Sequence, residues 1–158
     1  GKIDHYDKAH LFNLANEGEY YAAGKSRTLI DYRSWKIMPF ICYDLRFPVW
    51  LRNTEEADLM IFVAQFPERR RLAFTSLLPA RAIENVCFVA GVNALGRDGN
   101  DMIYCGDSNV WDYEGHRLGH DTYNKPGIWT FTLSKEKLHA FRKAYPFLRD
   151  RDKFILEQ

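Results

Sequence analysis

The sequence carries little net charge and has no long apolar run. Its 158 residues include 22 Lys and Arg against 21 Asp and Glu, a net charge of +1, so no global field attracts nucleic acid or anionic lipid. No stretch approaches the roughly 20 apolar residues that a membrane span needs, and the first residues lack the apolar core of a signal peptide. We therefore expect a cytoplasmic protein with neither a nucleic-acid nor a membrane partner.

Cysteine is also scarce. Cys42, Cys87 and Cys105 are the only three, an odd number at irregular spacing. This argues against a disulfide framework, and the absence of a C-x-x-C pair argues against a thiol oxidoreductase and a zinc site. Free thiols in a reducing compartment fit the pattern better.

Two further sites are disfavoured by their local sequence. His116 and His120 are spaced as metal ligands on a helix would be, but Gly115 and Gly119 favour a hairpin over a helix. Ser108 does not stand in a G-x-S-x-G pattern, which argues against a serine hydrolase. We expect no metal and no cofactor.

What the sequence does contain is apolar and aromatic residues, 46% and 15% of the chain, enough to bury a core in one domain. Apolar runs and turn residues predict one α/β unit without internal repeats. Strands are expected at 28–32, 35–42, 58–64, 86–92, 103–112 and 127–133, and helices at 48–56, 68–85 and 135–144. Within the helix at 68–85, we expect Leu72, Ser76, Pro79, Ala80 and Ile83 to face the sheet.

Cys42 stands where α/β folds expose reactive groups. It ends the apolar run Trp35 to Cys42 and is followed by polar residues, so it should lie at the carboxyl end of a buried strand. Backbone N–H groups after such a strand can face a substrate oxygen, and a thiol there needs a nearby cation or base to become a thiolate. From the strand pattern alone, the favoured interpretation of Cys42 is a small core residue.

Five sequence blocks resemble the nitrilase superfamily of carbon–nitrogen hydrolases, in that family's order, over nearly the whole chain. They are Tyr6-Asp7-Lys8-Ala9-His10-Leu11-Phe12, Cys42-Tyr43-Asp44-Leu45-Arg46-Phe47-Pro48, Ala80-Arg81-Ala82-Ile83-Glu84-Asn85, Asn93 with Gly96, and Gly106-Asp107-Ser108. The forms of the first two blocks are most similar to the ω-amidase branch.

The resemblance implies a Glu-Lys-Cys triad that cleaves non-peptide C–N bonds through a thioester. Cys42 would be the nucleophile, and Lys8 the lysine that stabilises the thiolate and, with the backbone N–H of Tyr43, the oxyanion. Glu17 matches the second, supporting glutamate, although a shift of two residues would assign that role to Glu19. Gln65 resembles part of the pocket lining.

The resemblance also implies residues around this group. Tyr43 and Phe66 would suit a short apolar acyl chain. Arg or Lys side chains nearby would be needed to hold a distal carboxylate. Residues expected to give structural support are Asp44, Arg46, Arg81 and Glu84.

One departure from the family pattern concerns the general base. That glutamate lies on a strand upstream of the lysine, and only seven residues precede Lys8 here. Residues 1–158 therefore resemble the larger, C-terminal part of a four-layer α-β-β-α sandwich, a partial domain without its N-terminal strands and helices. Because general acid–base help is worth about 10²–10⁴-fold, we expect these residues alone to be inactive or nearly so.

Two function classes stay open at this stage. The first is a cofactor-free amidohydrolase, in dimers as the family implies, that uses water to release ammonia from a small linear amide. A 2-oxo acid ω-amide such as 2-oxoglutaramate is the expected substrate, with N-carbamoyl hydrolysis as the alternative. The second class is a truncated, non-catalytic homologue that acts as an interaction subunit.

Overall fold

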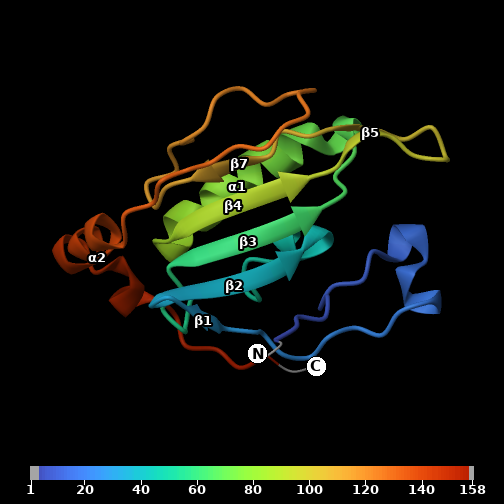
Figure 1. Cartoon of the computed structure of the whole chain (residues 1–158). Coiled ribbons are helices and arrows are strands. Elements are labelled where there is room, and N and C mark those ends of the chain that lie inside the picture. The colour runs from blue at the N-terminus through green and yellow to red at the C-terminus, as the bar shows by residue number, and fades with distance from the viewer. Residues whose placement is uncertain (1–3, 157–158) are drawn as a thin grey trace.

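A mixed five-stranded sheet organises the computed structural model, which describes residues 4–156 (Figure 1). Its strands lie in the order β1-β2-β3-β4-β7; β2, β3 and β4 are parallel, and the edge strands β1 and β7 are antiparallel to their neighbours. Two short strands, β5 and β6, form a separate antiparallel pair. The expected α/β class is confirmed.

The element bounds are as follows. The strands are β1 (Ile30–Tyr32), β2 (Trp35–Ile41), β3 (Leu59–Ala64), β4 (Phe88–Asn93), β5 (Leu95–Arg97), β6 (Ile103–Cys105) and β7 (Asn109–Trp111). The α-helices are α1 (Arg71–Asn85) and α2 (Lys135–Ala144), and the 3₁₀ turns are η1 (Asn13–Ala15), η2 (Glu17–Glu19), η3 (Cys42–Arg46), η4 (Glu68–Arg70) and η5 (Phe147–Asp150). No helix among residues 4–156 is long and apolar enough to cross a membrane.

The hydrophobic core lies between the sheet and α1. Alternate residues of β2 and β3 are buried on this face, Met38 and Phe40 on one strand and Met60 and Phe62 on the other, as the two-residue period of a strand requires. Gly91 of β4 lets the helix approach closely, since a Cβ atom there would lie 2.5 Å from Leu78 Cδ1. The sheet and α1 are thus one packed unit.

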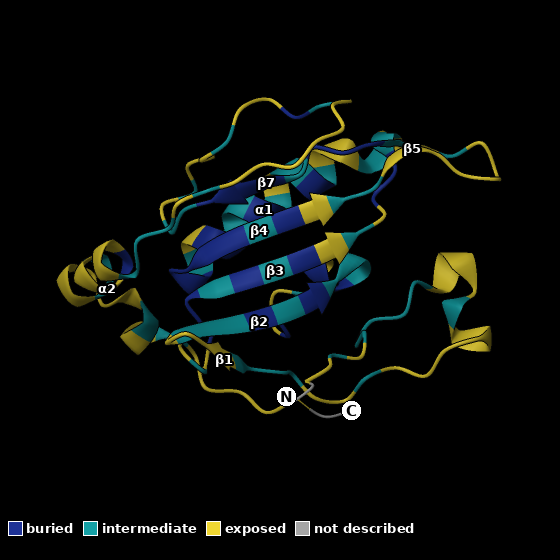
Figure 2. Ribbon diagram, in the orientation of Figure 1, coloured by how far each residue is buried: buried dark blue, intermediate teal, exposed yellow. Residues whose placement is uncertain are grey.

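The opposite face of the sheet is more open. In Figure 1, α1 lies behind the strands and the near face of β2, β3 and β4 is uncovered. Figure 2 shows exposed positions near the tips of β3 and β4, where the side chains of Val63 and Val92 are 51% and 53% exposed. Of the four layers that the resemblance implies, residues 4–156 show the sheet and α1.

The predicted face of the helix over 68–85 is wrong. Leu72 is 79% exposed and Ile83 53%, whereas α1 buries Phe74, Leu78, Arg81, Ala82 and Asn85. The predicted face did not include Arg81. The guanidinium of Arg81 instead finds hydrogen-bond acceptors within the protein. The buried face of α1 therefore includes Arg81 and is rotated about the helix axis relative to the predicted face.

The predicted helix over 48–56 does not form, and the segment is a series of turns. The buried side chain of Asn53 explains this, because it accepts a hydrogen bond from Ala57 N at 2.8 Å and donates to Ala57 O and Asn85 O, each at 3.0 Å. These bonds hold the backbone in a loop.

Two strand predictions also fail. The strand expected at 103–112 is divided between β6 and β7, because Gly106 and Asp107 both have positive φ, 72° and 57°, which ends an extended ladder. Residues 127–133 form no strand, since no strand of the described chain pairs with them. The fully exposed Ile128 lies in this segment.

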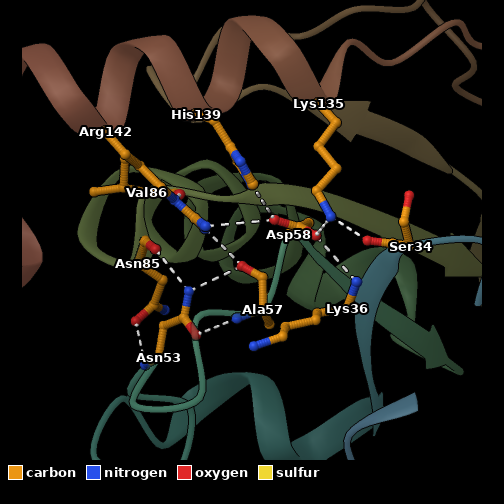
Figure 3. A network of polar contacts seen from close by, with 10 residues as sticks. All are labelled: Ser34, Lys36, Asn53, Ala57, Asp58, Asn85, Val86, Lys135, His139 and Arg142. Atoms are coloured by element: carbon orange, nitrogen blue, oxygen red, sulfur yellow. Dashed lines mark hydrogen bonds and ion pairs between the residues drawn. The ribbon is translucent and has the colours of Figure 1, made fainter. Parts of the chain in front are cut away.

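Helix α2 begins as the sequence predicts and is held to the sheet by a buried carboxylate. Ser134 caps it by accepting a hydrogen bond from Lys137 N. Asp58 lies just before β3; its Oδ2 is 3.0 Å from Lys135 Nζ, and its Oδ1 is 3.0 Å from His139 Nε2 and 3.4 Å from Arg142 Nη1 (Figure 3). One carboxylate therefore anchors three side chains of the helix.

Asp58→Asn is expected to lower the free energy of unfolding by about 2 kcal/mol at pH 7, because the buried anchor loses its charge. Burial alone would raise the pKa of Asp58, but hydrogen bonds from Lys36 N, His139 and Lys135 outweigh it and hold the pKa below its usual 3.8. The stabilisation is then present above pH 4 or so and is lost as pH falls through the folded-state pKa. Urea unfolding of the unchanged protein and of Asp58→Asn, at pH 7 and at pH 3, measures the loss of stability and its dependence on pH.

The exposed Asp31 of β1 offers a matched control. Asp31→Asn should change the free energy of unfolding by no more than about 0.5 kcal/mol. Equal stability of Asp58→Asn and the unchanged protein at pH 7 would contradict the anchoring role.

Candidate active site

Cys42 lies at the carboxyl end of β2, as its sequence context predicts. It opens the 3₁₀ turn η3 and has φ 46°, a left-handed conformation that a residue with a Cβ adopts only at a cost of about 1 kcal/mol or more. The side chain is partly exposed, whereas Cys87 and Cys105 are buried. Backbone strain and access thus coincide at this one thiol.

The loop after Cys42 is fixed by Asp44. This carboxylate is completely buried and accepts hydrogen bonds from Ile41 N at 3.1 Å, Tyr6 OH at 2.9 Å and His10 N at 3.0 Å. His10 Nδ1 also lies 2.9 Å from its Oδ1. Asp44 therefore connects the segment around Lys8 to the turn that carries the thiol.

Tyr6 completes this connection. Its hydroxyl accepts a hydrogen bond from Trp50 Nε1 at 3.0 Å while donating to Asp44. Burial, reinforced by the charge of Asp44, raises the pKa of Tyr6 far above its usual value. The hydroxyl therefore stays protonated and keeps donating at any physiological pH.

Lys8 and Glu17 form a close ion pair. Lys8 Nζ lies 2.5 Å from Glu17 Oε2, and the side chains are 13% and 28% exposed. The same oxygen accepts a hydrogen bond from Phe12 N at 2.9 Å. Burial would raise the pKa of Glu17, but these bonds outweigh it and lower the pKa. Glu17 is thus the carboxylate that contacts Lys8, whereas Glu19 is exposed.

The surroundings of Cys42 act on its thiol in opposite directions. Burial is the largest effect and raises its pKa; the Gln65 backbone and the charges of Lys8 and Arg70 lower it, and Glu17 raises it. The net pKa is above the usual 9.0, so the thiol is protonated at neutral pH. A reaction that needs the thiolate therefore needs a group to accept this proton.

Three more residues were expected to line the pocket, and they differ in burial and contacts: Tyr43, Phe66 and Gln65. The ring of Tyr43 lies between Phe12 and Phe47, with centroid distances of 5.0 Å to each. Phe66 is buried in the core, with its ring centroid 5.3 Å from that of Phe74. Gln65 has an exposed side chain and contributes its backbone to Cys42.

Two of the sequence blocks, those with Asn93 and Ser108, position the backbone at Gln65 and Phe66. Asn93 accepts a hydrogen bond from Phe66 N at 2.7 Å and donates to Phe66 O at 3.0 Å. Ser108 Oγ in turn accepts from Asn93 N at 2.9 Å. These two blocks therefore fix the segment that follows β3, whose backbone contacts the thiol of Cys42.

Two of the residues expected to give structural support, Arg81 and Arg46, differ in burial. Arg81 is buried and donates from Nε and Nη2 to Leu45 O at 3.0 and 2.9 Å, and from Nη1 to Glu84 Oε1 at 3.1 Å. It thereby fixes the turn after Cys42 from the α1 side. Arg46 is exposed, with its Cζ 6.0 Å from the centroid of the Phe66 ring.

One surface turn brings possible metal ligands together. The side-chain ligand atoms of Asp112, Glu114 and His116 lie within 4.8 Å of one another. Asp112 Oδ1 accepts hydrogen bonds from the backbone N–H groups of Glu114 and His116, both at 2.9 Å, as an Asx-type turn does. The hydrogen bonds of the turn explain why these three side chains lie together. His120, whose spacing from His116 would suit a metal site on a helix, is not part of the group.

The sequence interpretation missed Arg70. Its sequence context assigned it no role at the site, yet its charge acts on Cys42 and its Cζ lies 4.7 Å from the centroid of the Phe12 ring. The available signal was its position, three residues after the Gln65-Phe66-Pro67 segment. Nothing local distinguishes it from Arg69 or Arg71.

The sequence model of the carbon-nitrogen hydrolase family matches residues 1–143. Because the match covers most of the chain, and the fold and the strand-end cysteine agree with it, the protein belongs to this family. The family expected from the five blocks is confirmed.

Two curated relatives and one solved structure are similar to the chain over most of its length. The chain is 44% identical to an omega-amidase, YafV, of Yersinia enterocolitica, over 99% of this chain and 61% of that protein. It is 35% identical to the 2-oxoglutaramate amidase of Bacillus subtilis, over 94% and 57% of the two chains. XC1258 from Xanthomonas campestris, a CN-hydrolase superfamily protein crystallised with an arsenic adduct in its active site, is 44% identical with a TM-score of 0.92, over 96% and 60%. The chain thus spans about three fifths of these relatives.

Proposed function

We propose that this chain carries the nucleophile of a cysteine-dependent amidohydrolase that releases ammonia from the ω-amide of a short 2-oxo acid. The observation that carries the proposal is the partly exposed Cys42 at a strand end, electrostatically coupled to the Lys8–Glu17 pair. The names of two relatives, an omega-amidase and a 2-oxoglutaramate amidase, support the substrate class.

In the proposed reaction, the Cys42 thiol gives its proton to a general base, which the family resemblance places upstream of Lys8, and the thiolate attacks the amide carbon. The same proton passes from the base to the nitrogen, and the C–N bond breaks as ammonia leaves. The resulting thioester is then hydrolysed by water to the acid, and the thiol is restored. Lys8 stabilises the negative charge on sulfur and on the tetrahedral oxygen, because it is a fixed, largely buried cation. Glu17 keeps Lys8 in place through the short contact described above.

Ammonia release from a panel of amides tests this function in the natural polypeptide that carries these residues. We expect 2-oxoglutaramate and 2-oxosuccinamate to be hydrolysed at least about 10-fold faster, as kcat/KM, than N-carbamoyl amino acids, since a pocket built for one polar pattern rejects another. Preference for carbamoyl compounds would assign the alternative branch of the family. No release from any compound would favour a non-catalytic interaction subunit.

A further inference from the structure

Arg70 packs against Phe12, whose ring also contacts the nucleophile turn. Its Cζ lies 4.7 Å from the centroid of the Phe12 ring, and that ring contacts the ring of Tyr43 at 5.0 Å. The backbone N–H of Phe12 binds Glu17. Arg70 is therefore packed against the residues that surround Cys42, although it comes from η4, directly before α1.

The guanidinium of Arg70 lacks an anionic partner in the described chain. Its Nε is buried and has no hydrogen-bond partner among residues 4–156, and Arg70 takes part in none of the ion pairs found there, whereas its neighbour Arg71 lies 2.5 Å from a carboxylate oxygen of Asp107. Buried polar groups are nearly always paired. An unpaired one at a candidate active site indicates a group that is satisfied by a ligand.

The local charges favour an anion at this position. Burial lowers the pKa of Arg70, and the positive charges of Arg69 and Arg46 lower it further, while Cys42 raises it. The charges of two neighbouring guanidinium groups thus act on Arg70. An anionic ligand relieves this repulsion, and a planar carboxylate matches the fork of an arginine.

We propose that Arg70 determines substrate specificity by binding a carboxylate at the end of the substrate remote from the scissile amide. The inference rests on the proposed function for the identity of the reaction, and adds which side chain of this protein holds the acid end of the substrate. Lys8 serves the reacting oxygen, so the two cations act on opposite ends of one short molecule.

Alkylation of Cys42 tests the anion site without requiring turnover. Iodoacetate and iodoacetamide react with a thiolate in the same way and differ in the carboxylate. At low ionic strength, Arg70→Met is expected to lower the ratio of the iodoacetate rate to the iodoacetamide rate about 10-fold, because a partly buried charge interaction is lost. Mass spectrometry separates Cys42 from the buried Cys87 and Cys105.

Arg69→Met is the matched control, since Arg69 is the adjacent, exposed arginine. It should leave the ratio within about 2-fold of the unchanged protein, because an exposed charge is screened. Arg70→Lys keeps the charge and should retain most of the ratio, so it serves if Arg70→Met fails to fold. An unchanged ratio in a folded Arg70→Met, or an equal loss in Arg69→Met, overturns the proposal.

Kinetics with paired amides test the same site during turnover. For succinamate, Arg70→Met should lower kcat/KM by roughly 10- to 100-fold, mainly through KM, because a charge-assisted hydrogen bond is lost. For neutral butyramide, the change should stay within about 3-fold. Equal losses for both amides would indicate a structural role and overturn the inference. If the unchanged protein hydrolyses neither these amides nor 2-oxoglutaramate, the proposed function fails, and the alkylation ratio still decides on Arg70.

Discussion

Cys42→Ala is expected to abolish ammonia release, lowering kcat/KM by roughly 10⁴-fold or more, as loss of a covalent nucleophile does. Among residues 4–156 no other thiol can replace it, because Cys87 and Cys105 are buried. Burial raises the pKa of Cys87 to about 12 and that of Cys105 to about 11. The measurement is a steady-state ammonia assay on the natural polypeptide with its preferred ω-amide.

Two controls make this result specific. Cys87→Ala should retain activity within about 10-fold in protein that folds, since the residue only packs in the core. Urea unfolding should place Cys42→Ala within about 1 kcal/mol of the unchanged protein, because its side chain is small and partly exposed. Substantial activity of a folded Cys42→Ala would exclude the thioester route.

Asp44→Ala is expected to lower the free energy of unfolding by about 3–5 kcal/mol and kcat/KM by at least about 100-fold. Removing a completely buried acceptor leaves Tyr6 OH, His10 N and Ile41 N without their partner, and each unsatisfied buried donor costs about 1–3 kcal/mol. The loop that carries Cys42 also loses its connection to the Lys8 segment, and small displacements at a reacting group are costly. Urea unfolding and the ammonia assay measure the two effects.

Asp44→Asn separates the shape of this side chain from its charge. The amide keeps one acceptor oxygen, so the loss of stability should be smaller than for alanine, about 1–3 kcal/mol. Asp101→Ala provides an exposed comparison, since that carboxylate is 87% exposed in its pair with Arg97, and it should change stability by less than about 1 kcal/mol. A loss below about 1 kcal/mol for Asp44→Ala would contradict the anchoring role.

Local sequence predicted those parts of the fold that local physics determines. The turn between β1 and β2 formed at Arg33 and Ser34, with φ of 47° and 66°, because a two-residue hairpin matches the twist of its strands when both residues are left-handed. The buried strands β2, β3 and β4 and the capped helix α2 also form near the predicted positions. Failures occurred where the hydrogen bonds of one side chain decided the backbone, as those of Asn53 to Ala57 and Asn85 do at 48–56.

The sequence alone therefore determined the α/β class, the family, and the position of Cys42 at the end of a buried strand, since these follow from apolar periodicity and from short contiguous blocks. Only the tertiary structure decided which charged groups are buried and paired. Arg81 reaches the carbonyl of Leu45, Asp58 binds α2, and Arg70 is left beside the thiol without an anionic partner in the described chain. These outcomes depend on long-range packing, because the cost of burying a charge is set by the partners that the fold brings to it.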